Sequence, residues 1–150
     1  MPNDEFTVSI QAISASGAKI ALAAAERLAA EKKLKVSIAI VDNAGNLIAF
    51  QRVDGACVTG IEAAMRKART AVHLSAPTKV FEDLLHGGMT SLLAFDFISP
   101  SQGGVPLMLG GVAIGAIGCS GGSGQDDEML ANAGVAAFHD AIAKGSKGHD

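Results

Sequence analysis

The stretch VSIAIVDNAGNLIAFQRV, residues 36–53, decides the fold of this chain. Two runs of β-branched and other apolar residues, 36–41 and 47–53, lie on either side of Asp-Asn-Ala-Gly-Asn at 42–46. Asn and Gly adopt the backbone angles of tight turns, so apolar runs that flank them indicate an antiparallel β-hairpin. Residues 105–119 repeat the pattern, with a Gly-Gly pair at 110–111 between runs 105–109 and 112–119. Two hairpins need no crossover connection, and the sequence therefore predicts an antiparallel sheet rather than a Rossmann-type parallel one.

Helical periodicity marks the segments before, between and after the two hairpins. Residues 14–33 are rich in Ala and Leu, with Ser14 or Ser16 as an N-cap, and residues 59–73 carry an apolar stripe at helical spacing. Pro77 is expected to open a short helix that ends at His86, and residues 126–143 form a last amphipathic helix. This order predicts one α+β domain over residues 1–150, a sheet with helices packed against it.

Composition places the chain among single-domain globular proteins. It has 150 residues, of which 49% are hydrophobic and 18% charged, and this is too apolar for a disordered chain. The formal net charge of −3 argues against nucleic acid as a partner, since a nucleic-acid binder needs a basic surface. No apolar run reaches the roughly 18–20 residues of a membrane-spanning helix, so no membrane partner is expected either.

The chain ends and the cysteines add three expectations. The start, MPNDEFTVS, has acidic residues where a signal peptide carries positive charge, so we expect a cytoplasmic protein. Residues 1–8 and 145–150 are predicted to be flexible ends. Cys57 and Cys119 match neither the spacing of a zinc pair nor a cofactor-attachment motif, and they are expected to be unpaired thiols.

Three blocks of sequence resemble a known family. The first is VDNAGNL at 41–47 with RVDGA at 52–56, and the second is KARTA at 67–71. The third joins GGVP at 103–106, GGVAIGAIGCSGG at 110–122 and QDDE at 125–128. In order and spacing these blocks resemble the GlcG/HbpS family of haem-binding-protein-like domains, which also occurs as the C-terminal domain of PduO-type proteins. The resemblance covers roughly residues 14–140.

The resemblance implies a fold, an assembly and a class of ligand. The fold would be profilin-like, a five-stranded antiparallel sheet flanked by helices. The assembly would be a homo-oligomer, a tetramer or an octamer. Haem is a possible cofactor by resemblance, although no residue can be transferred from the family as an axial ligand of the iron.

The helix expected over 59–73 carries the most informative polar face. Glu62, Arg66, Arg69 and His73 are spaced by four, three and four, which places them within about 60° of one another on a helix. Two guanidinium groups and an imidazole on one stripe are able to hold a carboxylate, either of a small acid or of haem propionates. The alternative is a solvated helix face with one Glu62–Arg66 ion pair.

Glycines are dense between residues 103 and 124. Glycine lets a ligand or another backbone approach closely, and we expect these turns to gather beside the Arg66/Arg69 helix and to leave a cavity. A phosphate site is disfavoured, because acidic residues at 126–128 fill the first turn of the following helix and repel an anion. The alternatives are a pocket for a neutral ligand or cofactor and close packing at a subunit contact.

The remaining polar residues give weaker signals. His86 precedes two glycines, so it is able to turn toward a metal or a haem iron, or it is simply exposed. The metal ligands stay undefined, since the histidines have no HxxxH or HxE spacing. Ser120 lies in a GxSxG pattern, but a helix does not follow it at once as a nucleophile elbow requires.

These observations lead to a ligand-binding protein of the GlcG/HbpS type, with haem or a related tetrapyrrole as the leading ligand. The first alternative is a cofactor-independent enzyme that acts on a small organic acid by proton transfer or elimination, and the second is a structural accessory protein. The predicted catalytic residues are Asp54, Arg69 and His73. The predicted ligand-binding residues are Arg66, Thr70, His86, Gly103, Gly104, Gly111 and Asp126.

Overall fold

Both predicted hairpins are present in the computed structural model, which describes residues 4–148 except for the side chain of Lys147. Strand β1 (Ser37–Asp42) pairs antiparallel with β2 (Leu47–Arg52). The turn between them is held by Asp42, whose Oδ1 accepts the backbone N–H groups of Ala44 and Asn46, each at 2.9 Å. Gly45 completes the turn with φ of +84°, a backbone angle that side chains disfavour.

The second hairpin joins the first into one sheet. It consists of β3 (Gly104–Leu109) and β4 (Val112–Ser120), and β4 pairs antiparallel with β1, so the strand order is β2-β1-β4-β3. The antiparallel α+β architecture is thus confirmed. The fifth strand implied by the resemblance is wrong for residues 4–148: the sheet has the four strands of the two hairpins.

Four α-helices and a 3₁₀ turn complete the fold. They are α1 (Ala15–Glu31), α2 (Thr59–Leu74), α3 (Lys79–His86), η1 (Thr90–Ala94) and α4 (Gly124–Lys147). Ser14 caps α1 by accepting the N–H of Gly17, and Ser123 caps α4 by accepting the N–H of Asp126. Helix α4 is longer at both ends than the predicted 126–143. At its start it begins directly after the capping Ser123.

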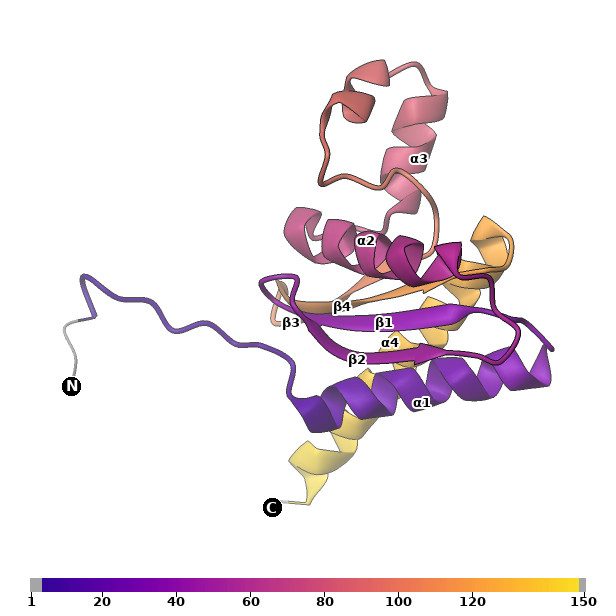
Figure 1. The fold of residues 1–150 in the computed structure, drawn as a ribbon. Coiled ribbons are helices and arrows are strands. Elements are labelled where there is room, and N and C mark those ends of the chain that lie inside the picture. The colour runs from indigo at the N-terminus through magenta and orange to yellow at the C-terminus, as the bar shows by residue number, and fades with distance from the viewer. Residues whose placement is uncertain (1–3, 149–150) are drawn as a thin grey trace.

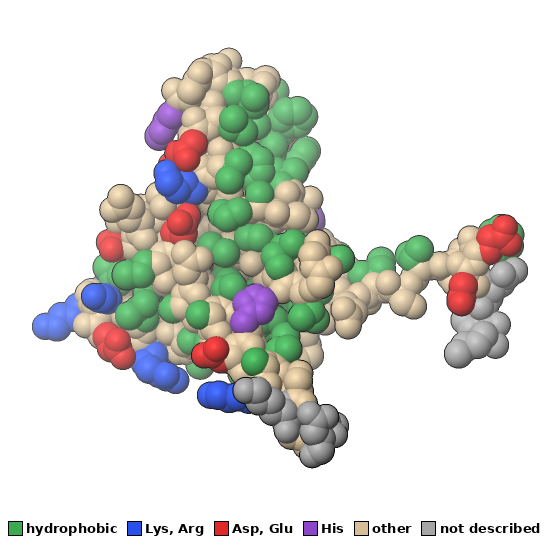
Figure 2. Space-filling model, turned by 180° about the vertical axis from the view of Figure 1, so that it is seen from behind, with side chains coloured by type: hydrophobic (Ala, Val, Ile, Leu, Met, Phe, Trp, Pro, Cys, Tyr) green, Lys and Arg blue, Asp and Glu red, His purple; other side chains and the backbone are tan. Residues whose placement is uncertain are grey.

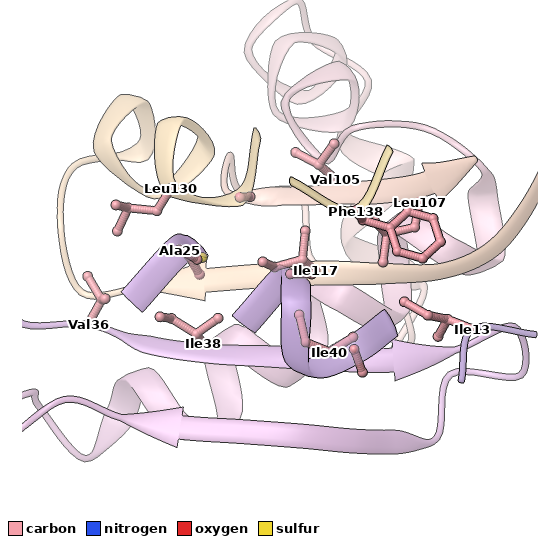
Figure 3. Packing of buried hydrophobic residues seen from close by; sticks show 14 of the residues in the cluster. Ile13, Ala25, Val36, Ile38, Ile40, Val105, Leu107, Ile117, Leu130 and Phe138 are labelled. Atoms are coloured by element: carbon pink, nitrogen blue, oxygen red, sulfur yellow. The ribbon is translucent and has the colours of Figure 1, made fainter. Parts of the chain in front are cut away.

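The helices cover both faces of the sheet (Figure 1): α1 and α4 lie on one face, and α2 lies on the other. The larger part of the core fills the space between the sheet, α1 and α4. Figure 3 shows Ile38, Ile40 and Ile117 of the strands directed at Leu130 and Phe138 of α4. Each of these side chains is buried, and they hold α4 and the sheet together.

Helix α2 packs closely on the sheet. Its buried face includes the small residues Ala64, Ala68 and Ala71, and it rests over Gly118 of β4. A Cβ atom at Gly118 would meet the carbonyl oxygen of Ala64. Glycine at position 118 is therefore required by the close packing of α2 on β4.

Two segments stand away from the body in Figure 1. One is α3 with η1, which rises beyond α2; α3 has no buried residue, and Leu92 is the buried residue of η1. The other is the extended chain before α1. No helix within residues 4–148 is long and apolar enough to cross a membrane.

The flexibility of residues 1–8 and 145–150 stays a prediction. Residues 145–147 belong to α4, whereas residues 1–3 and 149–150 lie outside the described part of the chain. The single domain over residues 1–150 likewise stays a prediction for those ends.

Candidate functional site

The polar stripe of α2 forms one wall of a pocket. The cavity measures about 220 Å³ and is lined by Glu62, Arg66, Arg69 and His73 of α2 together with Asp96 and Phe97 of the loop after η1. The helical spacing therefore brings all four stripe residues to one place, as predicted.

The two arginines of the pocket share one carboxylate. Oε1 of Glu62 lies 3.8 Å from Nε of Arg66 and 4.0 Å from Nη1 of Arg69. All three side chains are at least 41% exposed, and ion pairs at such distances in water are weak. Because each guanidinium has five N–H donors, both keep donors for a ligand. The carboxylates of Glu62 and Asp96 oppose an incoming anion.

The turn between β1 and β2 fixes the inner end of the stripe. Nε of Arg69 donates to the carbonyl oxygen of Gly45 at 3.3 Å, and Nε2 of His73 lies 3.0 Å from the carbonyl oxygen of Ala44. A carbonyl only accepts, so this contact puts the proton on Nε2 and leaves Nδ1 of His73 free of this bond. A Cβ atom at Gly45 would lie 2.7 Å from Nε2 of His73. Glycine at position 45 therefore allows both the backbone angle of the turn and the close approach of His73 to it.

Thr70, predicted to bind ligand, instead anchors the loop that carries the other wall. Its side chain is fully buried, and its hydroxyl reaches the carbonyl oxygens of Arg66 at 2.8 Å and Phe97 at 3.2 Å. The same oxygen accepts the N–H of Ser99 at 2.9 Å. Nη2 of Arg66 adds a bond to the carbonyl oxygen of Asp96 at 3.2 Å. Thr70 is therefore a positioning residue for Asp96 and Phe97.

At Phe97 the pocket adjoins an apolar stretch of the chain. Phe97 is 56% exposed, and Phe95 and Leu93 beside it in the chain are 47% and 66% exposed. The two phenyl rings lie 5.6 Å apart, centroid to centroid. A ligand with a carboxylate and a flat apolar body matches this combination of charged inner wall and aromatic margin.

Four predicted site residues lie elsewhere. Asp54 is exposed in the turn between β2 and the start of α2, whereas Arg69 and His73 lie toward the end of that helix. His86 is exposed at the end of α3, and Gly111 is exposed in the β3–β4 turn. Asp126 lies in the first turn of α4. None of the four lines the pocket, so the structure does not bring Asp54 together with Arg69 and His73.

The glycines at 103 and 104 are buried against α2 rather than in the pocket. A Cβ atom at Gly104 would meet the carbonyl oxygen of Lys67, and one at Gly103 would lie 2.9 Å from Nζ of that lysine. Within residues 103–124 no glycine lines the cavity. The expectation that these turns enclose the cavity is wrong for the single chain: Gly103, Gly104 and Gly118 lie against α2, and a Cβ atom at Gly110 or Gly111 would have nothing within 4 Å.

The cysteines are free, as predicted, and they differ in environment. Cys57 is exposed, and hydrogen bonds from the hydroxyl and the backbone N–H of Thr59 lower the pKa of its thiol. Burial raises the pKa of the Cys119 thiol. In the part of the chain that the structure describes, no three His, Cys, Asp or Glu side chains group as metal ligands do.

Sequence reasoning missed Asp96 and Phe97. Both belong to a stretch without helical or strand periodicity, and only the fold brings it over α2. A signal was present: two of the six phenylalanines occur at 95 and 97, and such a concentration is unusual for a loop.

Comparison with known proteins identifies relatives across most of the chain. The family described as haem degrading protein HbpS-like matches residues 13–136. Protein GlcG of Escherichia coli strain K12 is 33% identical over 108 residues, which cover 72% of this chain and 81% of GlcG.

Two crystal structures extend the likeness to the fold. A double mutant of HbpS from Streptomyces reticuli has a TM-score of 0.83 at 34% sequence identity, with coverage of 91% of this chain and 92% of that one. The complex of PduOC with haem has a TM-score of 0.77 at 28% identity, with coverage of 84% and 94%. The resemblance seen in the three sequence blocks is therefore confirmed.

Proposed function

This chain belongs to the HbpS-like family, and on that premise we propose that it binds a small amphipathic molecule that carries a carboxylate, with haem or a related tetrapyrrole as the leading ligand. A relative of the same fold, PduOC, forms a complex with haem. The observation that carries the proposal is the convergence of two guanidinium groups and one imidazole on a pocket whose outer margin is aromatic.

The residues of the pocket suit one part of haem in particular. Arg66 and Arg69 provide forked donors for propionate groups, and His73 is the imidazole of the pocket with a ring nitrogen to offer. The cavity of about 220 Å³ is smaller than the roughly 300–1,000 Å³ of sites that enclose a drug-sized ligand. We therefore assign the propionate edge to the pocket and the flat body to the surface of Phe95 and Phe97. A bound haem supplies a redox-active iron.

Two further parts of the proposal concern assembly and location. A homo-oligomer, tetramer or octamer, agrees with a site that a single chain leaves open on its aromatic side. A cytoplasmic location stays a prediction. The alternative of an enzyme for a small organic acid has no support in these comparisons, and the placement of Asp54 removes one of its three predicted residues from the pocket.

Titration with hemin, followed by Soret absorbance, tests the proposal. Arg66→Gln and Arg69→Gln are each expected to weaken hemin binding by about tenfold, as expected for a lost charge-assisted contact of about 1.5 kcal/mol. Glu62→Gln should strengthen binding, because it removes a carboxylate that competes for both guanidinium groups. Arg27→Gln, on the exposed surface of α1, is the matched control and should leave the affinity unchanged.

Two additional readouts define the role of each group. The dimethyl ester of hemin, which lacks free carboxylates, should bind the native protein about as weakly as hemin binds the double arginine variant. His73→Ala should weaken hemin binding without moving the Soret band of bound hemin, because the proposal places the propionate edge, and not the iron, beside this imidazole. Equal hemin affinity in the native protein and the double arginine variant would refute the proposed site.

A further inference from the structure

The pocket beside α2 is lined by charges of both signs. Arg66 and Arg69 contribute guanidinium groups, and Glu62 and Asp96 contribute carboxylates. Guanidinium groups alone would select an anion, whereas opposite charges on facing walls match a ligand that carries both signs itself. Glu62 lies between the two arginines, 3.8 Å and 4.0 Å from their nitrogens. This leaves Asp96 as the acidic group on the wall opposite α2.

The side chain of Asp96 is not used within the described part of the chain. Its backbone carbonyl oxygen accepts Nη2 of Arg66 at 3.2 Å, but among residues 4–148 its carboxylate takes part in no ion pair or hydrogen bond. An ionised carboxylate only accepts hydrogen bonds. Its natural complement is therefore a cationic donor such as an ammonium group.

The backbone around Asp96 is held in place by α2. Besides the bond from Arg66, the buried hydroxyl of Thr70 contacts the carbonyl oxygen of Phe97 at 3.2 Å and accepts the N–H of Ser99 at 2.9 Å. These contacts fix the chain at Asp96 and directly after it. The acidic wall and the basic wall are thus arranged before a ligand arrives, which lowers the cost of binding.

Asp96 is also isolated in the sequence, where it is the only charged residue between positions 87 and 125. The chain before it forms the projecting α3–η1 segment, over which Figure 2 shows hydrophobic side chains gathered. Its neighbours Phe95 and Phe97 are 47% and 56% exposed. Charges that serve solubility are spread over a surface with both signs interspersed. A single carboxylate in an apolar stretch, placed in the pocket, points instead to a ligand.

We propose that the pocket binds a free α-amino acid with an apolar side chain, in its zwitterionic form. The proposal rests on the carboxylate site of Arg66 and Arg69 proposed above. It adds Asp96 as the acceptor of the α-ammonium group and Phe97 as the surface for the side chain. Both charges of an amino acid are attached to one carbon atom, so they require opposite charges on the walls of one small cavity.

The size and charge of the pocket favour this class over two related ones. The volume of about 220 Å³ is below the roughly 300–1,000 Å³ of sites for drug-sized ligands, which suits a molecule as small as an amino acid. A dicarboxylic acid would place its second carboxylate near Asp96, and like charges repel. A simple amine would leave Arg66 and Arg69 without an anion.

Calorimetric titration with leucine and two analogues tests whether both charges of the ligand are read. N-Acetylleucine lacks the ammonium group, and isoamylamine lacks the carboxylate. Leucine is expected to bind the native protein with a Kd of about 1 mM or lower, and each analogue about tenfold more weakly or less tightly still. Absence of leucine binding at concentrations up to about 10 mM, or equal binding of N-acetylleucine, would overturn the proposal.

The variant Asp96→Asn assigns the ammonium to its acceptor. It should weaken leucine binding by about tenfold and should not weaken binding of N-acetylleucine, because that analogue has no ammonium group to lose a contact. Asp54→Asn, in the exposed turn before α2, is the matched control and should leave leucine binding unchanged. Circular dichroism verifies the fold of both variants. An equal loss of both ligands in Asp96→Asn would mean that Asp96 acts on the fold alone, against the proposal.

The outcome for the amino acid is separable from the outcome for hemin. If the double variant Arg66→Gln/Arg69→Gln loses hemin while the native protein fails to bind leucine, the hemin site stands and the amino-acid site is wrong. If leucine binding requires both arginines and Asp96 while hemin binding requires none of them, the amino-acid site stands and the hemin site is wrong.

Discussion

At the residue scale, the ion pair between Lys67 and Asp127 connects α2 to α4. Nζ of Lys67 lies 3.0 Å from Oδ2 of Asp127, and the two side chains are 6% and 3% exposed. The ammonium also donates to the carbonyl oxygen of Cys119, and Oδ1 of Asp127 accepts the N–H of Gly122. Because the second bonds of both partners go to backbone, the pair fixes the turn between β4 and α4 beneath α2.

Loss of one partner from this pair is expected to be costly. Lys67→Met should lower the free energy of unfolding by about 3–5 kcal/mol, because it leaves the buried charge of Asp127 without compensation. Urea denaturation measures the change. Lys79→Met is the control: Lys79 pairs with Asp83 at 2.9 Å on the exposed surface of α3, and its substitution should hardly move the midpoint. A similar midpoint for the two variants would contradict the buried role of Lys67.

At the element scale, local sequence signals predicted the hairpins and helices, and they failed where tertiary contacts decide. Turn chemistry at 42–46 and at 110–111 is local, so both hairpins follow from it. The loop over 95–99 has no local period, and it takes its place through the buried hydroxyl of Thr70. For the same reason the stripe of α2 was predictable, whereas its opposite wall, Asp96 and Phe97, was not.

The same distinction between local and tertiary signals explains why the surroundings of the glycines were not predictable. Their number between 103 and 124 was evident, but local sequence does not tell whether a glycine faces a ligand or a neighbouring backbone. In the structure Gly118 and Gly104 face backbone atoms of α2. A glycine next to a backbone atom tolerates no side chain, since the backbone cannot rotate away as a flexible side chain can.

Helix α4 offers a test of this argument with two glycines in one element. A Cβ atom at Gly134 would lie 2.8 Å from the carbonyl oxygen of Ala21 in α1 and 2.7 Å from Cδ1 of Ile117, whereas nothing lies within 4 Å at Gly145. Gly134→Ala should therefore destabilise the protein by about 1–3 kcal/mol, because overpacking exceeds the gain in helix propensity. Gly145→Ala should stabilise it by up to about 1 kcal/mol. Thermal unfolding measures both, and a gain at Gly134 would show that α1 moves to accommodate the methyl group.

At the scale of the whole molecule, the pocket lies between two parts that differ in how they are anchored. Arg69 and His73 belong to α2, which is packed on the sheet through Ala64, Ala68 and Ala71. Asp96 and Phe97 follow the projecting α3–η1 segment, in which Leu92 is the buried residue. A ligand that contacts both walls connects the well-packed body to the part with little core of its own.

Hydrogen exchange followed by mass spectrometry should reveal this difference. Amides of residues 80–95 are expected to exchange through local opening, well before those of β1 and β4, because few buried contacts hold the projection in place. Saturating hemin should slow exchange over 95–99, since a ligand that binds the closed state opposes opening in proportion to its occupancy. The double variant Arg66→Gln/Arg69→Gln should lose that protection and keep the fast exchange of the projection. Exchange of residues 80–95 at the same rate as β1 would mean that the projection opens only with the whole protein, and the two walls of the pocket would then be equally rigid.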